Sequence, residues 1–173
     1  AKIVIEKPAD DSTHYITAEP SMPEIEAEVK LIGPTPDVTS DTNFEWTTKI
    51  RYTGPNNREF NLDLPQENKK GKDYSPNWNN QFRGGDVVFT AKTTYKGKSL
   101  EDVTQGVRIR GTNPTAATLT AELGGFPAAN IACQESRLRQ FGAGGVPLFG
   151  PPNGYGVFQV DNPPVSANGV WNW

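Results

Sequence analysis

The residue best placed to do acid–base chemistry is Glu135, on a helix expected from about residue 127 to 140. On a helical wheel Glu135 falls at the edge of an apolar arc formed by Ile131, Leu138 and Phe141. A carboxyl group beside apolar neighbours loses part of its hydration, which favours the protonated form. A carboxyl group that stays protonated near neutral pH can act as a general acid. The wheel therefore predicts Glu135 as a candidate general acid.

The same spacing allows a second interpretation. Arg139 follows Glu135 by four residues, a separation at which opposite charges form an ordinary ion pair on a helix surface. The wheel alone leaves both interpretations open. Cys133 lies elsewhere on the wheel and is interpreted as a small buried side chain rather than a nucleophile.

Two motifs in this region resemble those of one enzyme family. The stretch 134–141 reads QESRLRQF and the stretch 154–160 reads GYGVFQV. The first resembles the helix that carries the catalytic Glu-Ser pair of lytic murein transglycosylases. The second is similar to that family's Gly-Leu-Met-Gln motif followed by Ile or Val, with Val157 and Phe158 replacing Leu and Met. The resemblance covers residues 113–173 and says nothing about the first 112.

The resemblance implies a lysozyme-like, mostly helical fold for this region and cleavage of peptidoglycan glycan strands. Glu135 would protonate the oxygen that links N-acetylmuramic acid to N-acetylglucosamine. It would then accept the proton of the sugar's C6 hydroxyl, which closes a 1,6-anhydro ring. Ser136 would help to orient the substrate or Glu135, and Gln159 with the Gly156 backbone would line the sugar groove. By themselves, Gln159 could equally be an exposed strand residue and Gly156 a turn glycine.

The small number of carboxylates in this region fits a mechanism with one acidic residue. Glycosidases that use water pair two carboxylates across the scissile bond. Downstream of Glu135 the other candidate is Asp161, in an expected loop. We predict no cofactor and no metal, since a single His makes His-based metal sites a poor interpretation. The family's third motif, an Ala-Tyr-Asn-like segment, does not occur before Trp173, so we expect the front portion of a longer enzyme, inactive alone.

Helices are expected to position these residues. Asn113 and Pro114 predict a helix start, and Gly124-Gly125 predicts its end. A second helix is expected from Pro127 to about 140, with a stop at Gly142. Gly- and Pro-rich loops follow, with an extended piece possible at 155–160. We place a domain boundary near residue 111, so that residues 112–173 form the N-terminal portion of a lysozyme-like domain.

The first 111 residues have the pattern of an antiparallel sandwich. Apolar and polar residues alternate along short runs separated by turn signals such as Gly33-Pro34 and Lys96-Gly97. About seven strands are expected, at 3–6, 15–18, 25–31, 44–52, 60–64, 87–95 and 107–109. The number and spacing favour an immunoglobulin-like β-sandwich, in architecture only because one Cys cannot form the usual disulfide. We expect Trp46, Ile50 and Phe89 to be buried in its core and residues 1–111 to fold by themselves.

Two polar stretches of this part have simpler interpretations. The run 69–72 contains three lysines and is expected to be a solvated loop. Tyr74 and Trp78 lie among Asn77, Asn79 and Asn80, a combination that could stack on sugars. The preferred interpretation is a long hairpin loop with one buried Trp.

The composition of the chain argues against several functional classes. The 173 residues fit one or two small domains, and the net charge is −3, with no basic surface evident for a nucleic acid. There is no apolar run long enough to span a membrane and no signal peptide. Five charged residues lie after residue 112: Glu122, Glu135, Arg137, Arg139 and Asp161.

The chain is therefore interpreted as mainly β, with a partial helical segment, and as a lytic transglycosylase fragment of bacterial or phage origin. Its expected partner is peptidoglycan, and its expected location is periplasmic, extracellular or virion-associated. Two non-catalytic alternatives remain. The sandwich could be a module that binds a partner protein or cell-wall glycan, or a structural unit of a phage tail, secretion or cell-surface assembly.

Overall fold

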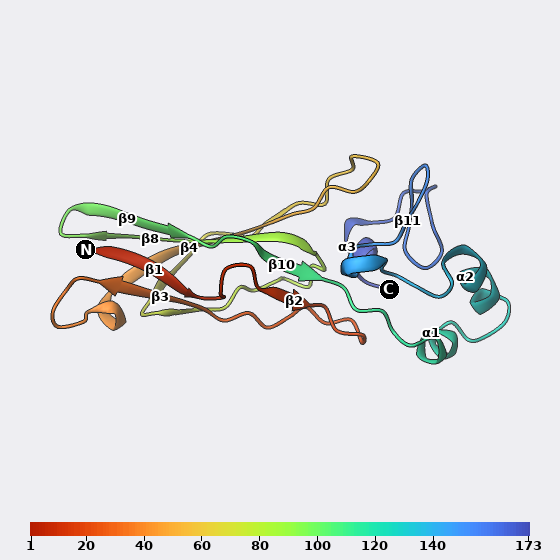
Figure 1. Ribbon diagram of the computed structural model, residues 1–173, viewed down its shortest axis with the longest axis horizontal. Helices are drawn as coiled ribbons and strands as arrows, with labels where there is room; N and C mark the ends of the chain where they lie inside the picture. The colour runs from red at the N-terminus through yellow and green to blue at the C-terminus, as the bar shows by residue number, and fades with distance from the viewer.

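The computed structural model describes residues 1–173 and is mainly β, with three short helices after residue 112. Sheets occupy one end of an elongated molecule and the helices occupy the other (Figure 1). Below, residues 1–111 are called the two-sheet part and residues 112–173 the C-terminal part. The strands of the first are β1 (Lys2–Lys7), β2 (Thr13–Tyr15), β3 (Ala27–Ile32), β4 (Asn43–Arg51), β5 (Leu62–Asp63), β6 (Glu67–Lys70), β7 (Asp73–Tyr74), β8 (Gly85–Tyr95), β9 (Lys98–Val103) and β10 (Val107–Arg110).

These strands form two sheets around a shared core. The smaller sheet has the order β1-β3-β7. The larger has the order β2-β10-β8-β4-β5, with β6 also paired to β4 and β9 to β8. Every pair is antiparallel except β2 with β10. A short 3-10 turn, η1 (Thr39–Asp41), precedes β4.

Alternating burial along the long strands builds this core, as the sequence predicts. In β4, residues 44, 46, 48 and 50 are buried and the residues between them are partly or fully exposed. Trp46, Ile50 and Phe89 are each fully buried, which confirms the expectation for these three side chains. Trp46 stacks on Tyr74 of the opposite sheet, with ring centroids 4.9 Å apart.

Three strands lie outside the expected set because they lack an alternating pattern. β6, β7 and β9 are edge strands, and each is joined to its sheet on one side. Main-chain pairing with a longer neighbour fixes β6 and β9 as strands, since their side chains are mostly exposed, and β7 has only two residues, too few to show a period. Lys69 and Lys70 therefore lie on β6, and the expectation of a loop for the run 69–72 is wrong at these two residues.

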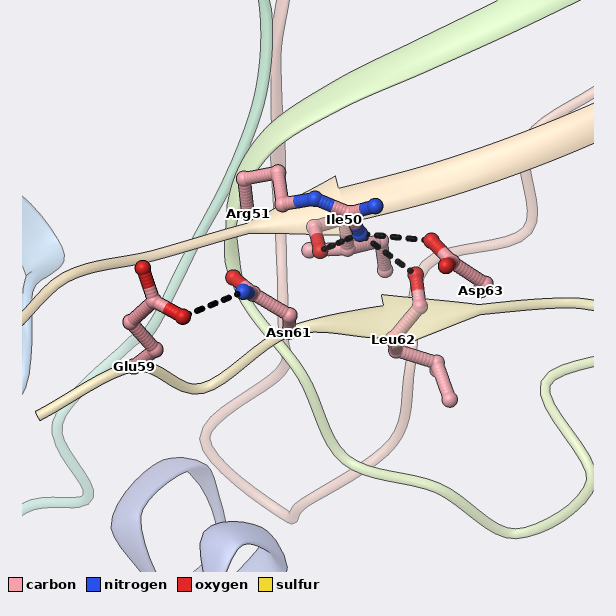
Figure 2. A network of polar contacts seen from close by, with 6 residues as sticks. All are labelled: Ile50, Arg51, Glu59, Asn61, Leu62 and Asp63. Carbon is pink, nitrogen blue, oxygen red and sulfur yellow. Dashed lines mark hydrogen bonds and ion pairs between the residues drawn. The ribbon is translucent and has the colours of Figure 1, made fainter.

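A charged contact fixes β4 against β5. Arg51 Nη1 lies 2.6 Å from the Asp63 carboxylate and donates to the carbonyl oxygens of Ile50, at 2.9 Å, and Leu62, at 3.4 Å (Figure 2). The Arg51 guanidinium holds the pKa of Asp63 below its ordinary value. The contact lies at the base of the loop 52–61, which reaches toward the C-terminal part (Figure 1).

The C-terminal part contains α1 (Ala116–Glu122), α2 (Ala128–Ser136) and α3 (Ala167–Trp171). A 3-10 turn, η2 (Ala143–Gly145), and the two-residue strands β11 (Phe149–Gly150) and β12 (Gly154–Tyr155) lie between α2 and α3. None of the helices has the length and apolar content of a membrane span. The expected extended piece at 155–160 is instead one end of β12 followed by a tight turn.

The first of the expected helices begins later than predicted. Its N-cap is Thr115, whose hydroxyl oxygen accepts from the Thr118 backbone N–H at 3.1 Å. Asn113 lies outside the helix because its side chain is bonded elsewhere, to Gln140 and Phe141. The predicted end is confirmed, since Gly124 and Gly125 both take positive φ values after α1.

The second helix is shorter than predicted. α2 ends at Ser136, and Arg137 and Leu138 take left-handed φ values of 54° and 57°. The backbone N–H groups of Arg137 and Leu138 donate back to Cys133 and Ala132, at 2.8 Å and 3.3 Å. This hydrogen-bonded ending closes the helix six residues before the glycine that was expected to stop it.

Three aromatic side chains join the C-terminal part to the end of the two-sheet part. Tyr155, Trp171 and Phe141 are buried within the same 20-residue core cluster as Trp46. Each ring lies over a glycine of the two-sheet part, namely Gly54, Gly84 and Gly111 respectively. A Cβ on any of these glycines would lie 1.9–2.2 Å from the facing side chain. The three glycines therefore provide the space in which the C-terminal part packs.

Candidate functional site

Glu135 lies in the last turn of α2 and is exposed to solvent. The predicted position beside an apolar arc is wrong, because α2 packs through the small residues Ala129, Ala132 and Ser136. Ile131, the expected centre of that arc, is 50% exposed. Cys133 is exposed as well, which corrects the expectation of a buried thiol.

The alternative ion pair is also absent. Glu135 takes part in none of the six salt bridges of the chain. The Arg139 side chain donates from Nε to the Ser136 carbonyl at 3.3 Å. The Glu135 carboxylate is therefore free of protein partners and accessible to a ligand or to water.

Ser136 fixes the helix end directly after Glu135. Its buried hydroxyl donates to the Ala132 carbonyl at 2.9 Å and accepts from the Arg139 backbone N–H at 3.2 Å. Both bonds are to backbone atoms, so the hydroxyl makes no contact with the Glu135 carboxylate. Ser136 is next to Glu135 in the chain, but its side chain points into the protein.

Gln140 connects the two sequence motifs. This side chain is only 3% exposed, and its Oε1 accepts from the Val157 backbone N–H at 3.1 Å. Its Nε2 donates to the carbonyls of Gly169 and Val170, at 3.1 Å and 2.9 Å. The motif that contains Glu135 is thus bonded directly to the segment 156–159 and to α3.

Gly156 is required by this arrangement. It takes a φ of 74°, which favours glycine, and a Cβ there would lie 2.6 Å from Gln140 Oε1. Its backbone N–H donates to the Leu148 carbonyl at 2.9 Å. Gly156 is therefore a buried turn glycine through which the second motif approaches the first.

The Gln159 side chain bonds back to the backbone of its own loop. Its Nε2 donates to the Gly156 carbonyl at 2.7 Å and to the Leu148 carbonyl at 3.4 Å. The residue is half-buried, with a left-handed φ of 49°. Its amide nitrogen is engaged within the protein, and the interpretation as a strand residue is wrong.

Apolar packing also brings the motifs together. Leu119 of α1, Ala132 of α2 and Val157 form a separate buried cluster, against which Leu138 and Trp173 pack. Sequence reasoning missed the connecting residues Gln140 and Asn113, because a polar side chain gives no periodic signal of burial. Asn113 Oδ1 accepts from the backbone N–H groups of Gln140 and Phe141, at 2.9 Å and 2.8 Å.

A mostly apolar cavity of about 450 Å³ lies beside this junction. Gln140, Val157 and Trp173 contribute to its wall, and its one carboxylate is the exposed Glu122 of α1. Glu135, Ser136, Gly156 and Gln159 do not line it. The structure brings the two motifs into contact without enclosing the Glu135 carboxylate.

The chain contains no group of three or more His, Cys, Asp or Glu side chains placed to hold a metal ion. Comparison with known proteins adds no further assignment, since no family model, curated protein or solved structure matches this chain.

Proposed function

We propose that the C-terminal part belongs to a lysozyme-like catalytic region that cleaves peptidoglycan, with Glu135 as its single general acid and base. One observation carries the proposal: Gln140 bonds to Val157, so the two motifs are in direct contact in three dimensions. Contact between the two motifs is what a shared substrate groove requires, and this is how the contact supports the proposal. Peptidoglycan lies outside the cytoplasmic membrane, so the proposed location is periplasmic, extracellular or virion-associated.

We further propose that the two-sheet part is an immunoglobulin-like sandwich. In that fold one sheet contains strands A, B and E and the other contains C, F and G. The order β1-β3-β7 fits A-B-E, and the order β4-β8-β10 fits C-F-G. The buried Trp46 lies on β4, at the place of the core Trp of strand C. The disulfide of antibody domains has no counterpart here, because Cys133 is the single Cys.

The proposed reaction transfers one proton out of Glu135 and one back. The protonated carboxyl group donates to the glycosidic oxygen as the bond from that oxygen to C1 of N-acetylmuramic acid breaks. The C6 hydroxyl of the same sugar bonds to C1, and its proton passes to the Glu135 carboxylate. The products are a 4-hydroxyl on the leaving N-acetylglucosamine and a 1,6-anhydro ring, and no water is consumed. General acid–base assistance of this kind contributes about 10²–10⁴ in rate.

The solvent exposure of Glu135 sets a condition on this chemistry. A general acid must lie within hydrogen-bond reach of the group that it protonates, and the cavity beside the two motifs does not include Glu135. Bound substrate must therefore cover Glu135 for it to act as an acid. The 173 residues by themselves are expected to turn over peptidoglycan slowly or not at all.

Release of soluble fragments from purified peptidoglycan tests the proposal. The sample is the full-length product of the gene that encodes these residues, as wild type and as Glu135→Gln. Glu122→Gln is the matched control, because Glu122 is the other exposed glutamate of the C-terminal part. Activity lost in Glu135→Gln and kept in Glu122→Gln supports the proposal. Equal activity of wild type and Glu135→Gln removes Glu135 from the mechanism.

A second candidate function is a non-catalytic binding or structural module of a phage tail, secretion or cell-surface assembly. Two observations favour it: the side chains of Ser136 and Gln159 bond to backbone atoms, and the cavity beside the motifs is not lined by Glu135. A full-length protein that binds peptidoglycan or a partner protein without releasing fragments would support this candidate.

A further inference from the structure

A second cavity, far from Glu135 in the chain, lies at the loop between β7 and β8. It has a volume of about 330 Å³ and is lined by residues 21–22 and 76–82. Two kinds of side chain meet there. One wall is apolar, with Met22, Trp78 and Phe82, and the rim carries four amide side chains.

The apolar wall is held in place by the two-sheet part. Met22, Trp78 and Phe82 are each half-buried and pack against the main core cluster. The Trp78 indole N–H donates to the Pro23 carbonyl at 3.0 Å, which fixes the ring. The wall is therefore formed before any ligand arrives, so that little conformational entropy is lost on binding.

The amide rim is formed by a tight turn. The Gln81 backbone N–H donates to the Trp78 carbonyl at 2.8 Å, across Asn79 and Asn80. Asn79 and Asn80 both take left-handed φ values, 51° and 58°. The Asn79 backbone N–H donates to Asn77 Oδ1 at 2.9 Å, which fixes the start of the turn. The side-chain amides of Asn79, Asn80 and Gln81 make no hydrogen bond within the protein, so each can donate to and accept from a ligand.

The absence of charge narrows the class of ligand. None of the residues that line the cavity is charged. A phosphate, a metal ion or a strongly charged peptide would therefore find no counter-charge here. A sugar presents hydroxyl groups that match amide donors and acceptors, and an apolar ring face that packs on aromatic side chains.

We propose that this cavity is a binding site for a neutral saccharide, held by the amides of Asn79, Asn80 and Gln81 against the ring of Trp78. An adjoining cavity of about 270 Å³ shares Met22, Pro76 and Trp78. It would allow a second sugar unit to lie next to the first, against the same tryptophan. The site uses none of the residues assigned to catalysis, and it goes beyond the proposed function.

An NMR titration of the 173-residue protein with two neutral probes, chitotetraose and cellotetraose, tests this site. A titration to about 10 mM detects dissociation constants of about 1 mM or tighter. Backbone amide shifts at residues 21–22 and 76–82 are the expected result for at least one probe. No shift at these residues with either probe would overturn the proposal.

Two sets of variants distinguish the loss of the amide side chains from a change in the fold of the turn. Asn79→Gly with Asn80→Gly keeps a turn that needs positive φ and removes two amides, so binding should weaken at least about tenfold. Asn57→Gly is the matched control, because Asn57 also has a left-handed φ, 62°, at an exposed turn outside the cavity. Unchanged binding by the double variant would refute the assignment of the rim. Glu135→Gln should bind the saccharide normally, so failure of this site and failure of the proposed catalysis are distinguishable.

Discussion

Trp171 occupies the space directly over Gly84: a Cβ added to Gly84 would lie 2.2 Å from Cζ3 of the Trp171 ring. The ring is fully buried, and it packs edge-on against Tyr52 with centroids 5.1 Å apart. The two residues are 87 positions apart in the chain. Because Gly84 has no side chain, it leaves the space that the Trp171 indole occupies. This contact explains how a helix of five residues, α3, is held against the two-sheet part.

Gly84→Ala is expected to destabilise the protein by about 1–3 kcal/mol, because the added methyl group overlaps a buried ring that cannot move away freely. Thermal unfolding followed by circular dichroism gives the comparison. Gly142→Ala is the control, because its Cβ would meet nothing closer than 3.6 Å and its φ of −88° suits alanine. A Gly84→Ala midpoint equal to that of the control would mean that Trp171 is not packed as described.

The two-sheet part alone should unfold cooperatively at a lower temperature than the whole chain. Removal of residues 112–173 exposes Tyr52 and Phe60, whose rings pack against Trp171 and Tyr155 respectively. Sixteen of the 20 residues of the core cluster lie within residues 1–111, so a folded structure should remain. Near-ultraviolet circular dichroism of a 1–111 fragment measures both points. A fragment without a cooperative transition would show that the sheets need the C-terminal part to fold.

Gln140→Leu is expected to cost about 1–3 kcal/mol, because it leaves the buried Val157 N–H and two carbonyls without partners. The amide resonance of Val157 should shift, since its hydrogen bond is lost. Gln134→Leu, at an exposed position of α2, is the control and should change stability by less than about 0.5 kcal/mol. If both variants are equally stable, Gln140 does not connect the motifs.

Acid should weaken one ion-pair cluster on the smaller sheet. Lys7 and Lys72 both bond the Glu28 carboxylate and lower its pKa from 4.5 to about 2. A carboxyl group whose pKa is lower in the folded state stabilises the fold above pH 4.5, and this contribution is lost as the pH falls through about 2. Glu28→Gln should therefore reduce stability at neutral pH and flatten the pH dependence in that window. Denaturant unfolding between pH 2 and 7 measures this, with Glu19→Gln as a control. A Glu28→Gln variant with the wild-type pH profile would contradict the assignment.

Sequence patterns predicted the parts of the fold that depend on burial of one face. Residues 44–50 alternate, and Trp46 and Ile50 are buried as expected. The edge strand β9 could not be found in this way, because its side chains are mostly exposed and its partner β8 fixes it through the backbone.

The candidate site was harder to predict for a related reason. A helical wheel weights large apolar residues, so it chose the side of α2 that carries Ile131. The helix instead packs through alanines and Ser136, because Val157 and α1 approach it closely. The three packing glycines gave no signal either, since the sequence around Gly54, Gly84 or Gly111 does not reveal which distant ring lies over it.

The identity of the released muropeptides tests the role of Glu135 most directly. Full-length protein incubated with purified peptidoglycan should release products that end in 1,6-anhydro-muramic acid. Mass spectrometry distinguishes these from hydrolysis products, which are heavier by one water, about 18 mass units. Glu135→Gln should lower their yield by a factor of at least about 10². Products with water added at the reducing end, or a Glu135→Gln variant as active as the wild type, would contradict the proposed mechanism.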